Sequence, residues 1–215
     1  RGTPQLRELT SGVTDVAAAL AGRRSCRAYR PEPIAVDLLD TVLAASLRGP
    51  SAGNTWALDL VVLDDEAAVA GYWDTSLPSG PRRDAFPWPG LLLAPVLVVP
   101  TIRIAAYTER YAEADKAATR LGESPDRWPV PYWWVDAGAA VMAMLLAASG
   151  LGLGSLLFGT FEREDALRER FGVPGDRRVV GTIALGWPDE VEHRGSASAR
   201  RGRPELVEVV HRRRW

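Results

Sequence analysis

The sequence predicts a single α+β domain in which helices pack against one central sheet. Some segments place apolar residues at spacings of three and four, as amphipathic helices do, whereas others are short apolar runs typical of buried strands. The two kinds of segment mix along 215 residues without a repeat or a linker, and a chain of this length buries about 70 % of its unfolded surface as one domain. We expect one domain over residues 13–215, preceded by an N-terminal extension over residues 1–12.

The first half of the chain contains a clear helical pattern over residues 35–47 and weaker ones over 13–21 and 65–73. Apolar runs over 58–63 and 91–99 predict strands. Because the second run is apolar throughout, we expect that strand to be buried on both faces of the sheet. Turns rich in Gly, Pro, Ser and Asn separate these elements.

The second half contains a long helical pattern over residues 133–149 and another over 162–171. Strands are predicted over 154–158 and 179–185, and an extended tail over 206–210. Between the halves, the aromatic segment 105–135 holds six of the seventeen aromatic residues. We expect this segment to form a lid or a pocket wall.

The stretch 137–161 has no charged residue and is long enough to span a membrane. However, Gly150, Gly152 and Gly154 interrupt it where a span would continue. We therefore expect a buried helix, a turn and a buried strand, and no membrane partner.

The composition is that of an ordinary globular protein: 47 % of the residues are hydrophobic, and 26 Lys and Arg balance 27 Asp and Glu. This balance disfavours a disordered tail, a collagen-like chain and a generally basic nucleic-acid binder. One cysteine, Cys26, and two histidines supply neither an intrachain disulfide nor a tetrahedral Cys/His zinc site. We expect no metal site and a reducing, cytoplasmic compartment. No secretory signal is visible, and the question of a removed leader stays open because the chain does not begin with Met.

No common catalytic motif is present: there is no GxSxG elbow, P-loop, HExxH or GxGxxG that opens a helix. Gly150 to Gly154 follow a helix and precede a strand, the reverse of a dinucleotide site, and predict a tight turn. Chemistry supplied by an organic cofactor is therefore favoured, with no protein side chain as the catalytic group. Cys26 is interpreted as a small packed residue and Asp136 as a charge at the N-terminus of the long helix.

Two arginine pairs occur at the same spacing near the two ends of the chain. On an extended backbone Arg23, Ser25 and Arg27 point to one side, because side chains alternate with period two. Arg201 and Arg203 repeat the pair. Guanidinium groups bind a phosphate bidentately, and a serine hydroxyl adds a donor. The alternative, a solvated basic face and a basic tail, remains open at this point.

Five blocks of sequence then occur in a fixed order. They are Arg23-Arg24-Ser25-Cys26-Arg27-Ala28-Tyr29, Gly49-Pro50-Ser51-Ala52-Gly53-Asn54, the helix 136–149 with Gly150-Leu151-Gly152-Leu153-Gly154-Ser155, Val180-Gly181-Thr182-Ile183-Ala184-Leu185-Gly186-Trp187-Pro188, and Arg203-Pro204 with Val209-Val210. In this order and at these separations they resemble the FMN-dependent nitroreductase family over residues 13–210. The resemblance implies a nitroreductase-like mixed central sheet wrapped by helices. It also implies a domain-exchanged homodimer with two FMN sites at the interface and a C-terminal arm over residues 200–215.

The resemblance further implies which residues hold FMN. Those expected at its phosphate, ribityl chain and ring are Arg23, Arg24, Ser25 and Arg27. Those expected to close on the phosphate are Arg201 and Arg203. The loop that the other subunit lays against the flavin corresponds to Pro50, Ser51, Ala52 and Asn54. The segment along the isoalloxazine face corresponds to Leu157, Phe158, Gly159 and Thr160. There the backbone N–H of Thr160 would bond the flavin N5, and a fixed donor favours a nitrogen that gains electron density on reduction.

Two departures from the family leave the substrate open. Many members continue the Asn with a Gln-Pro-Trp run, whereas Asn54 is followed by Thr55-Trp56, and a common Glu-Gly beside the flavin is replaced by Gly159-Thr160. Neither change removes a phosphate contact. Aromatic residues expected to border a pocket for a planar substrate are Trp56, Tyr107, Tyr111, Trp128, Tyr132 and Trp133. The alternatives are that Trp56 packs under the first strand and that the others pack a dimer interface.

The function that these expectations favour is an FMN-dependent oxidoreductase with ping-pong chemistry. NAD(P)H would deliver hydride to the flavin N5, and a nitroaromatic, a quinone or another conjugated acceptor would then take the electrons. One alternative is an oxidase or dehydrogenase of an azoline-type or other natural-product intermediate. Another is a flavin-binding protein without turnover.

Overall fold

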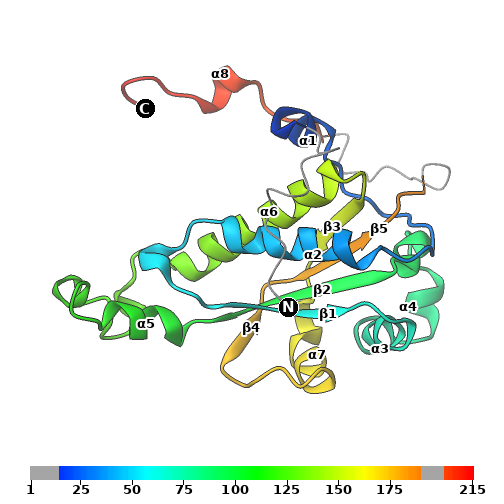
Figure 1. Ribbon diagram of the computed structural model, residues 1–215, viewed down its shortest axis with the longest axis horizontal. Coiled ribbons are helices and arrows are strands. Elements are labelled where there is room, and N and C mark those ends of the chain that lie inside the picture. Colours follow the sequence, from blue (N-terminus) through cyan, green and yellow to red (C-terminus); the bar gives the residue numbers. More distant parts are fainter. Residues whose placement is uncertain (1–14, 190–200) are drawn as a thin grey trace.

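A five-stranded sheet forms the centre of the protein in the computed structural model, which describes residues 15–189 and 201–215 (Figure 1). Strands β1 (Leu58–Leu63), β2 (Val96–Arg103), β5 (Thr182–Gly186) and β3 (Gly154–Phe158) lie side by side in this order, and β4 (Arg177–Val179) also pairs with β2. These named strands all pair antiparallel. A parallel contact enters only as the isolated bridge between Ser25 and Ser155, so the described sheet is antiparallel rather than mixed.

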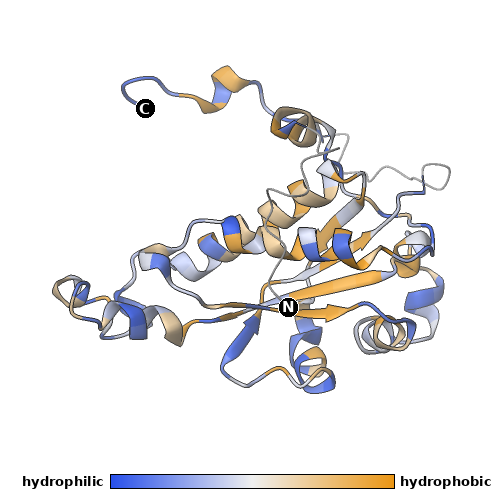
Figure 2. Ribbon diagram, in the orientation of Figure 1, coloured by the Kyte–Doolittle hydropathy of each residue, from blue (hydrophilic) through white to orange (hydrophobic). Residues whose placement is uncertain are grey.

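Helices cover both faces of this sheet. Helices α2 (Val36–Ala45) and α6 (Tyr132–Gly150) pack on one face, in a core that includes Val98 and Met144. Helices α3 (Glu66–Ser76) and α7 (Glu164–Arg170) pack on the other, in a core that includes Leu97 and Tyr72. Neighbouring residues of β2 thus enter different cores, and Figure 2 shows this strand as hydrophobic along its length. The expectation of a strand buried on both faces is confirmed.

The remaining helices lie around these layers. Helix α1 (Val16–Gly22) contacts α6, α4 (Pro81–Asp84) follows α3, and α5 (Ala105–Tyr111) follows β2. Helix α8 (Leu206–Val209) belongs to a C-terminal arm, residues 201–215, which is exposed throughout. In Figure 1 this arm extends past α1 and away from the sheet.

Several predicted boundaries need correction. Strand β2 begins at Val96 rather than at residue 91, because Pro89–Leu93 forms a 3-10 turn. The run 179–185 is split between β4 and β5 by Gly181, whose φ is +156°. The tail 206–210 is a short helix rather than extended, since Glu205 and Glu208 form a capping box. By contrast, the strands predicted at 58–63 and 154–158 match β1 and β3.

Helix α6 is the one described helix that is long and apolar enough to cross a membrane, with 44 % of its apolar window buried inside the protein. It packs against α1, α2, β2 and β3, and Val141, Met144 and Ala148 are almost fully buried. It is therefore a core helix, as the sequence predicts.

Candidate active site

An extended segment after α1 carries the first arginine motif along the edge of β3. Ser25 forms its parallel bridge with Ser155, and the Cys26 N–H donates to the Ser155 carbonyl at 3.0 Å. Cys26 is buried, whereas Arg23, Ser25 and Arg27 are partly exposed. The alternation expected from the sequence holds from Ser25 to Arg27, where Cys26 alone is buried, but not for Arg24, which is exposed beside Arg23.

A polar cavity of about 290 Å³ lies at one end of this segment, where α1 meets the C-terminal end of α6. Its polar lining residues are Arg23, Arg24, Ser149 and Ser155. Arg24 also donates to the Ala21 carbonyl at 2.6 Å, which holds its guanidinium against α1. Two cations and two hydroxyls around one cavity suit a phosphate group.

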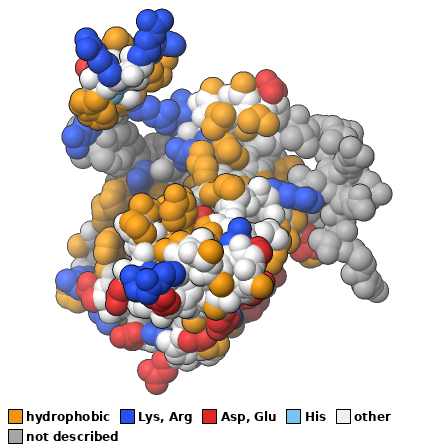
Figure 3. Space-filling model, turned by 90° about the vertical axis from the view of Figure 1, so that its left-hand side faces the viewer, with side chains coloured by type: hydrophobic (Ala, Val, Ile, Leu, Met, Phe, Trp, Pro, Cys, Tyr) orange, Lys and Arg blue, Asp and Glu red, His pale blue; other side chains and the backbone are white. Residues whose placement is uncertain are grey.

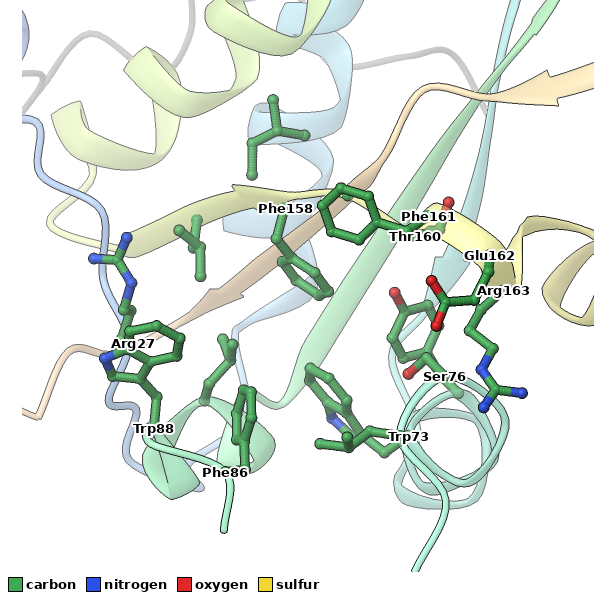
Figure 4. Close-up of a pocket in the computed structure, with 16 residues that line it drawn as sticks. Arg27, Trp73, Ser76, Phe86, Trp88, Phe158, Thr160, Phe161, Glu162 and Arg163 are labelled. Carbon is green, nitrogen blue, oxygen red and sulfur yellow. The ribbon is translucent and has the colours of Figure 1, made fainter. Parts of the chain in front are cut away.

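A larger cavity of about 370 Å³ lies at the other end, on the α3 face of the sheet (Figure 4). Its walls are aromatic: Trp73 stacks on Phe158 with ring centroids 5.7 Å apart, and the Arg27 guanidinium lies 5.4 Å from the centre of the Trp88 ring. The Trp73 indole N–H is buried and has no hydrogen-bond partner among the described residues. An aromatic cavity with Arg27 at one end and Glu162 and Arg163 at the other suits a conjugated ring system (Figure 4).

The last residues of β3 and the segment that follows border this aromatic cavity. Leu157, Phe158, Gly159 and Thr160 all line it, and Leu157 is 42 % exposed. Within the described part of the chain, no acceptor bonds the Thr160 backbone N–H. Next to it Phe161 is 84 % exposed and has a φ of +45°. A free backbone donor and an exposed ring therefore stand at the cavity mouth.

The model of the nitroreductase family matches residues 20–187 of this sequence. The chain belongs to the nitroreductase family. As a nitroreductase-family protein it is an oxidoreductase, and its antiparallel sheet with covering helices has the family's fold.

Individual relatives agree with this assignment. A putative NADH dehydrogenase/NAD(P)H nitroreductase of Archaeoglobus fulgidus is 26 % identical over 199 residues, 90 % of this chain and 94 % of the relative. An NADH dehydrogenase of Thermus thermophilus is 29 % identical over 198 residues, 85 % of this chain and 91 % of the relative. The fold is similar to that of the hypothetical oxidoreductase YcnD of Bacillus subtilis, with a TM-score of 0.71 and 21 % identity over 94 % of this chain and 75 % of that one.

The 50–54 loop of this nitroreductase-family chain lies far from both cavities. It packs along the N-terminal half of α6, where Gly49 meets Ala140 and the Ala52 N–H bonds Asp136, and thus on the α6 face of the sheet. Thirteen residues of helix, about 20 Å at the usual rise, separate Asp136 beside this loop from Ser149 beside the polar cavity. Pro50, Ser51, Ala52 and Asn54 therefore border neither the polar nor the aromatic cavity of their own subunit. Pro50 and Ser51 instead line a small cavity of about 50 Å³, together with Trp56 and Tyr107.

The aromatic segment 105–135 forms a small core of its own rather than a wall of the aromatic cavity. Tyr107, Trp128 and Trp133 are 1 %, 7 % and 7 % exposed and contact one another edge to face. Tyr111 packs on Trp128 with centroids 4.6 Å apart, and Tyr132 is 44 % exposed. Tyr107, Trp128 and Trp133 thus pack on one another inside the protomer, which is neither the lid nor the dimer-interface packing that the sequence left open.

Four further expectations can be compared with the structure. Trp56 is 68 % exposed and so does not pack under β1. Cys26 is buried, its thiol donates to the Ala28 carbonyl at 3.1 Å, and burial raises the pKa of the thiol. These properties agree with the prediction of a small packed residue. Asp136 is the fifth residue of α6, not its N-terminal charge, and accepts two hydrogen bonds instead. Arg201 and Arg203 lie on the exposed arm.

Sequence reasoning missed the aromatic residues that do line the larger cavity. They are Tyr72, Trp73, Phe86, Trp88 and Phe161. A usable signal was present in Phe86 and Trp88, two large apolar residues within a proline-rich loop that offers no helix or strand pattern to bury them. The aromatic segment 105–135 is denser in aromatic residues and gives the stronger sequence signal, although it does not line this cavity.

Proposed function

We propose that this nitroreductase-family protein binds FMN and transfers electrons from NAD(P)H to a nitroaromatic, a quinone or another conjugated acceptor. The observation that carries the proposal is the pair of cavities at the two ends of the Ser25–Ser155 contact. One is lined by cations and hydroxyls and the other by aromatic rings, which matches the two chemically different ends of FMN.

The residues present fit FMN by the chemistry of their donors. Arg23, Arg24 and Ser25 would hold the phosphate and ribityl chain, and Arg27 would face the ring from beside Trp88. Bound there, FMN would supply a two-electron carrier that takes hydride from a nicotinamide and yields it to an acceptor by ping-pong exchange.

The chain's own tasks are to bind, orient and exclude water. The free Thr160 N–H provides a fixed donor that costs no reorganisation when charge develops opposite it. Trp73 and Phe158 form a rigid stacked wall that keeps water from one side of the aromatic cavity. No side-chain acid or base is needed for these tasks, as the sequence predicts.

We also propose a homodimer. An exposed apolar stripe along α6 includes Val135 and Met142, 51 % and 37 % exposed. Trp56, which lines a small cavity together with residues of α6, is exposed as well. Figure 3 shows hydrophobic side chains gathered on the face of the molecule that presents α5 and the N-terminal end of α6. An apolar surface of this kind favours association, and Arg201 and Arg203 on the exposed arm would then reach a phosphate only through the dimer.

The visible spectrum of the purified protein titrated with FMN, before and after anaerobic NADH or NADPH, tests the function. We expect a bound flavin spectrum that a nicotinamide bleaches and that a nitroaromatic or quinone restores. Flavin that neither nicotinamide bleaches would reject the reductase and leave the oxidase alternative. A protein that holds FMN at full occupancy as a monomer by light scattering would reject the dimer.

A further inference from the structure

The 50–54 loop is held by hydrogen bonds from the aromatic segment and from α6. One carboxylate oxygen of Asp136, Oδ2, accepts from the Ala52 N–H at 2.8 Å and from the Tyr107 hydroxyl at 2.8 Å. Arg110 Nε donates to the Gly53 carbonyl at 2.8 Å. Three side chains from two helices thus fix two consecutive residues of a surface loop.

The loop has a backbone shape that needs such support. Gly53 and Asn54 both have positive φ, +63° and +55°, a conformation that costs free energy for a non-glycine residue such as Asn54. A Cβ at Gly53 would lie 2.8 Å from Cε2 of the Tyr111 ring, so the ring backs directly onto the loop. Asn54 is left exposed at the tip.

The supporting groups are themselves rigid. Tyr107 is 1 % exposed within the aromatic core, and burial, together with its bond to Asp136, raises the pKa of its hydroxyl, which therefore stays a donor. Arg110 is clamped by Asp115 through two bonds of 2.7 and 2.8 Å and by Glu113 at 3.1 Å. The loop shape is thus set before any ligand binds.

We propose that Asp136, Tyr107 and Arg110 are positioning residues, which hold the 50–54 loop in the shape that completes the FMN site of the other subunit. The proposal rests on the dimeric FMN function proposed above. The loop cannot serve the two larger cavities of its own subunit, because the polar one lies at the C-terminal end of α6 and the aromatic one on the opposite face of the sheet. The aromatic segment then acts as a scaffold for this loop rather than as a lid.

A mixed dimer tests whether the effect crosses between subunits. Two differently tagged variants, Asp136→Ala and Arg23→Ala, are co-expressed and the mixed dimer is isolated through both tags. If the proposal holds, one of its sites combines an intact Arg23 with an intact loop from the other subunit and binds FMN with wild-type affinity. The other site carries both defects. In each variant homodimer, every site should bind FMN at least about tenfold more weakly than in the wild-type protein.

A mixed dimer without any site of wild-type affinity would overturn the proposal, since Asp136 would then act within its own subunit. If Asp136→Ala gives no folded dimer, Arg110→Met takes its place in the same experiment. Arg120→Met is the matched control, because Arg120 pairs with Glu123 in the same segment without a contact to the loop. Its FMN affinity should be unchanged, and equal losses in Arg110→Met and Arg120→Met would also overturn the proposal.

This design separates the inference from the function on which it rests. A wild-type protein that binds no FMN rejects the proposed function before any variant is made. A wild-type dimer that binds FMN, together with Asp136→Ala and Arg110→Met homodimers that bind it equally well, rejects the positioning role alone. Melting temperatures measured without FMN identify a variant whose loss of affinity reflects a disturbed fold.

Discussion

Gly154→Ala is expected to disturb both the fold and the cofactor site, because β3 and the first arginine motif touch at this residue. A Cβ at Gly154 would lie 2.7 Å from Cys26 Sγ, 2.9 Å from Cys26 Cβ and 3.3 Å from Tyr29 Cε1. Neither neighbour can swing away, since Cys26 and Tyr29 are 5 % and 1 % exposed. The backbone of the motif must therefore move away from β3.

The size of the effect follows from the cost of overpacking a closed core, about 1–3 kcal/mol. In a domain of about 200 residues each kcal/mol lowers the melting temperature by about 2–4 °C, so a loss of about 2–12 °C is expected. Because Arg23 and Arg27 belong to the displaced segment, the affinity for FMN should fall as well. Thermal unfolding without ligand and a flavin titration measure the two effects.

Two further variants show whether the contact is responsible. Gly175→Ala is the matched control, since its Cβ would meet only Arg168 Nη2 at 3.7 Å, and its stability should change by less than about 0.5 kcal/mol. Cys26→Ala removes the nearest atom, so its effect and that of Gly154→Ala should not add in the double variant. A Gly154→Ala protein as stable as wild type, or strict additivity with Cys26→Ala, would refute the reasoning.

Four other predictions concern the cofactor, the substrate, assembly and pH. Arg23→Ala and Arg203→Ala should each lower the affinity for FMN by roughly ten- to a hundredfold but the affinity for riboflavin little, because riboflavin has no phosphate. Equal losses of affinity for both ligands in a titration would contradict this. Trp56→Gln should leave the melting temperature within about 2 °C of the wild-type value, since the ring is 68 % exposed. It should change the relative kcat/KM values among acceptors, and unchanged ratios would reject a pocket role. Met142→Glu should shift the dimer toward monomer in light scattering, because it places a charge on the apolar stripe of α6. Hydrogen bonds from Arg178 and from the Val179 N–H hold the pKa of Glu164 below its ordinary value of 4.5. The stabilisation from Glu164 is thus present above that pH and lost as the pH falls through the lowered pKa, so Glu164→Gln should flatten the acid limb of the unfolding free energy.

Local periodicity in the sequence was enough for most helices and strands but not for their ends. The run 91–99 is apolar throughout, yet its first residues form a 3-10 turn. The reason is Gly90, where a Cβ would lie 2.9 Å from Ala28 Cα, so this turn must fit against the first arginine motif. An apolar run indicates burial, but it cannot distinguish a buried strand from a buried turn when the deciding contact lies 60 residues away.

The two cavities differ in how far the sequence could reveal them. The polar one takes both its cations from the adjacent residues Arg23 and Arg24, which the sequence places together, but its two hydroxyls come from Ser149 and Ser155, which only the fold brings there. The aromatic one has walls from α3, from the loop 86–91 and from β3, which only the folded sheet brings together. Local density of aromatic residues pointed elsewhere because the aromatic segment 105–135 packs largely upon itself.

The composition of α6 has an explanation in the dimer that we propose. A helix that is apolar all round is buried on all sides, yet in the protomer α6 buries Met144 and Ala148 against the sheet and leaves Val135 and Met142 at the surface. Only Asp136 is charged between Tyr132 and Gly150, and its carboxylate is occupied by Ala52 and Tyr107. A second subunit on the exposed stripe would bury the remaining apolar side chains and bring the 50–54 loop, which Asp136 holds, to the other subunit. The same helix would then stabilise its own sheet, the dimer and the second subunit's cofactor site, which accounts for a membrane-length apolar sequence in a core helix.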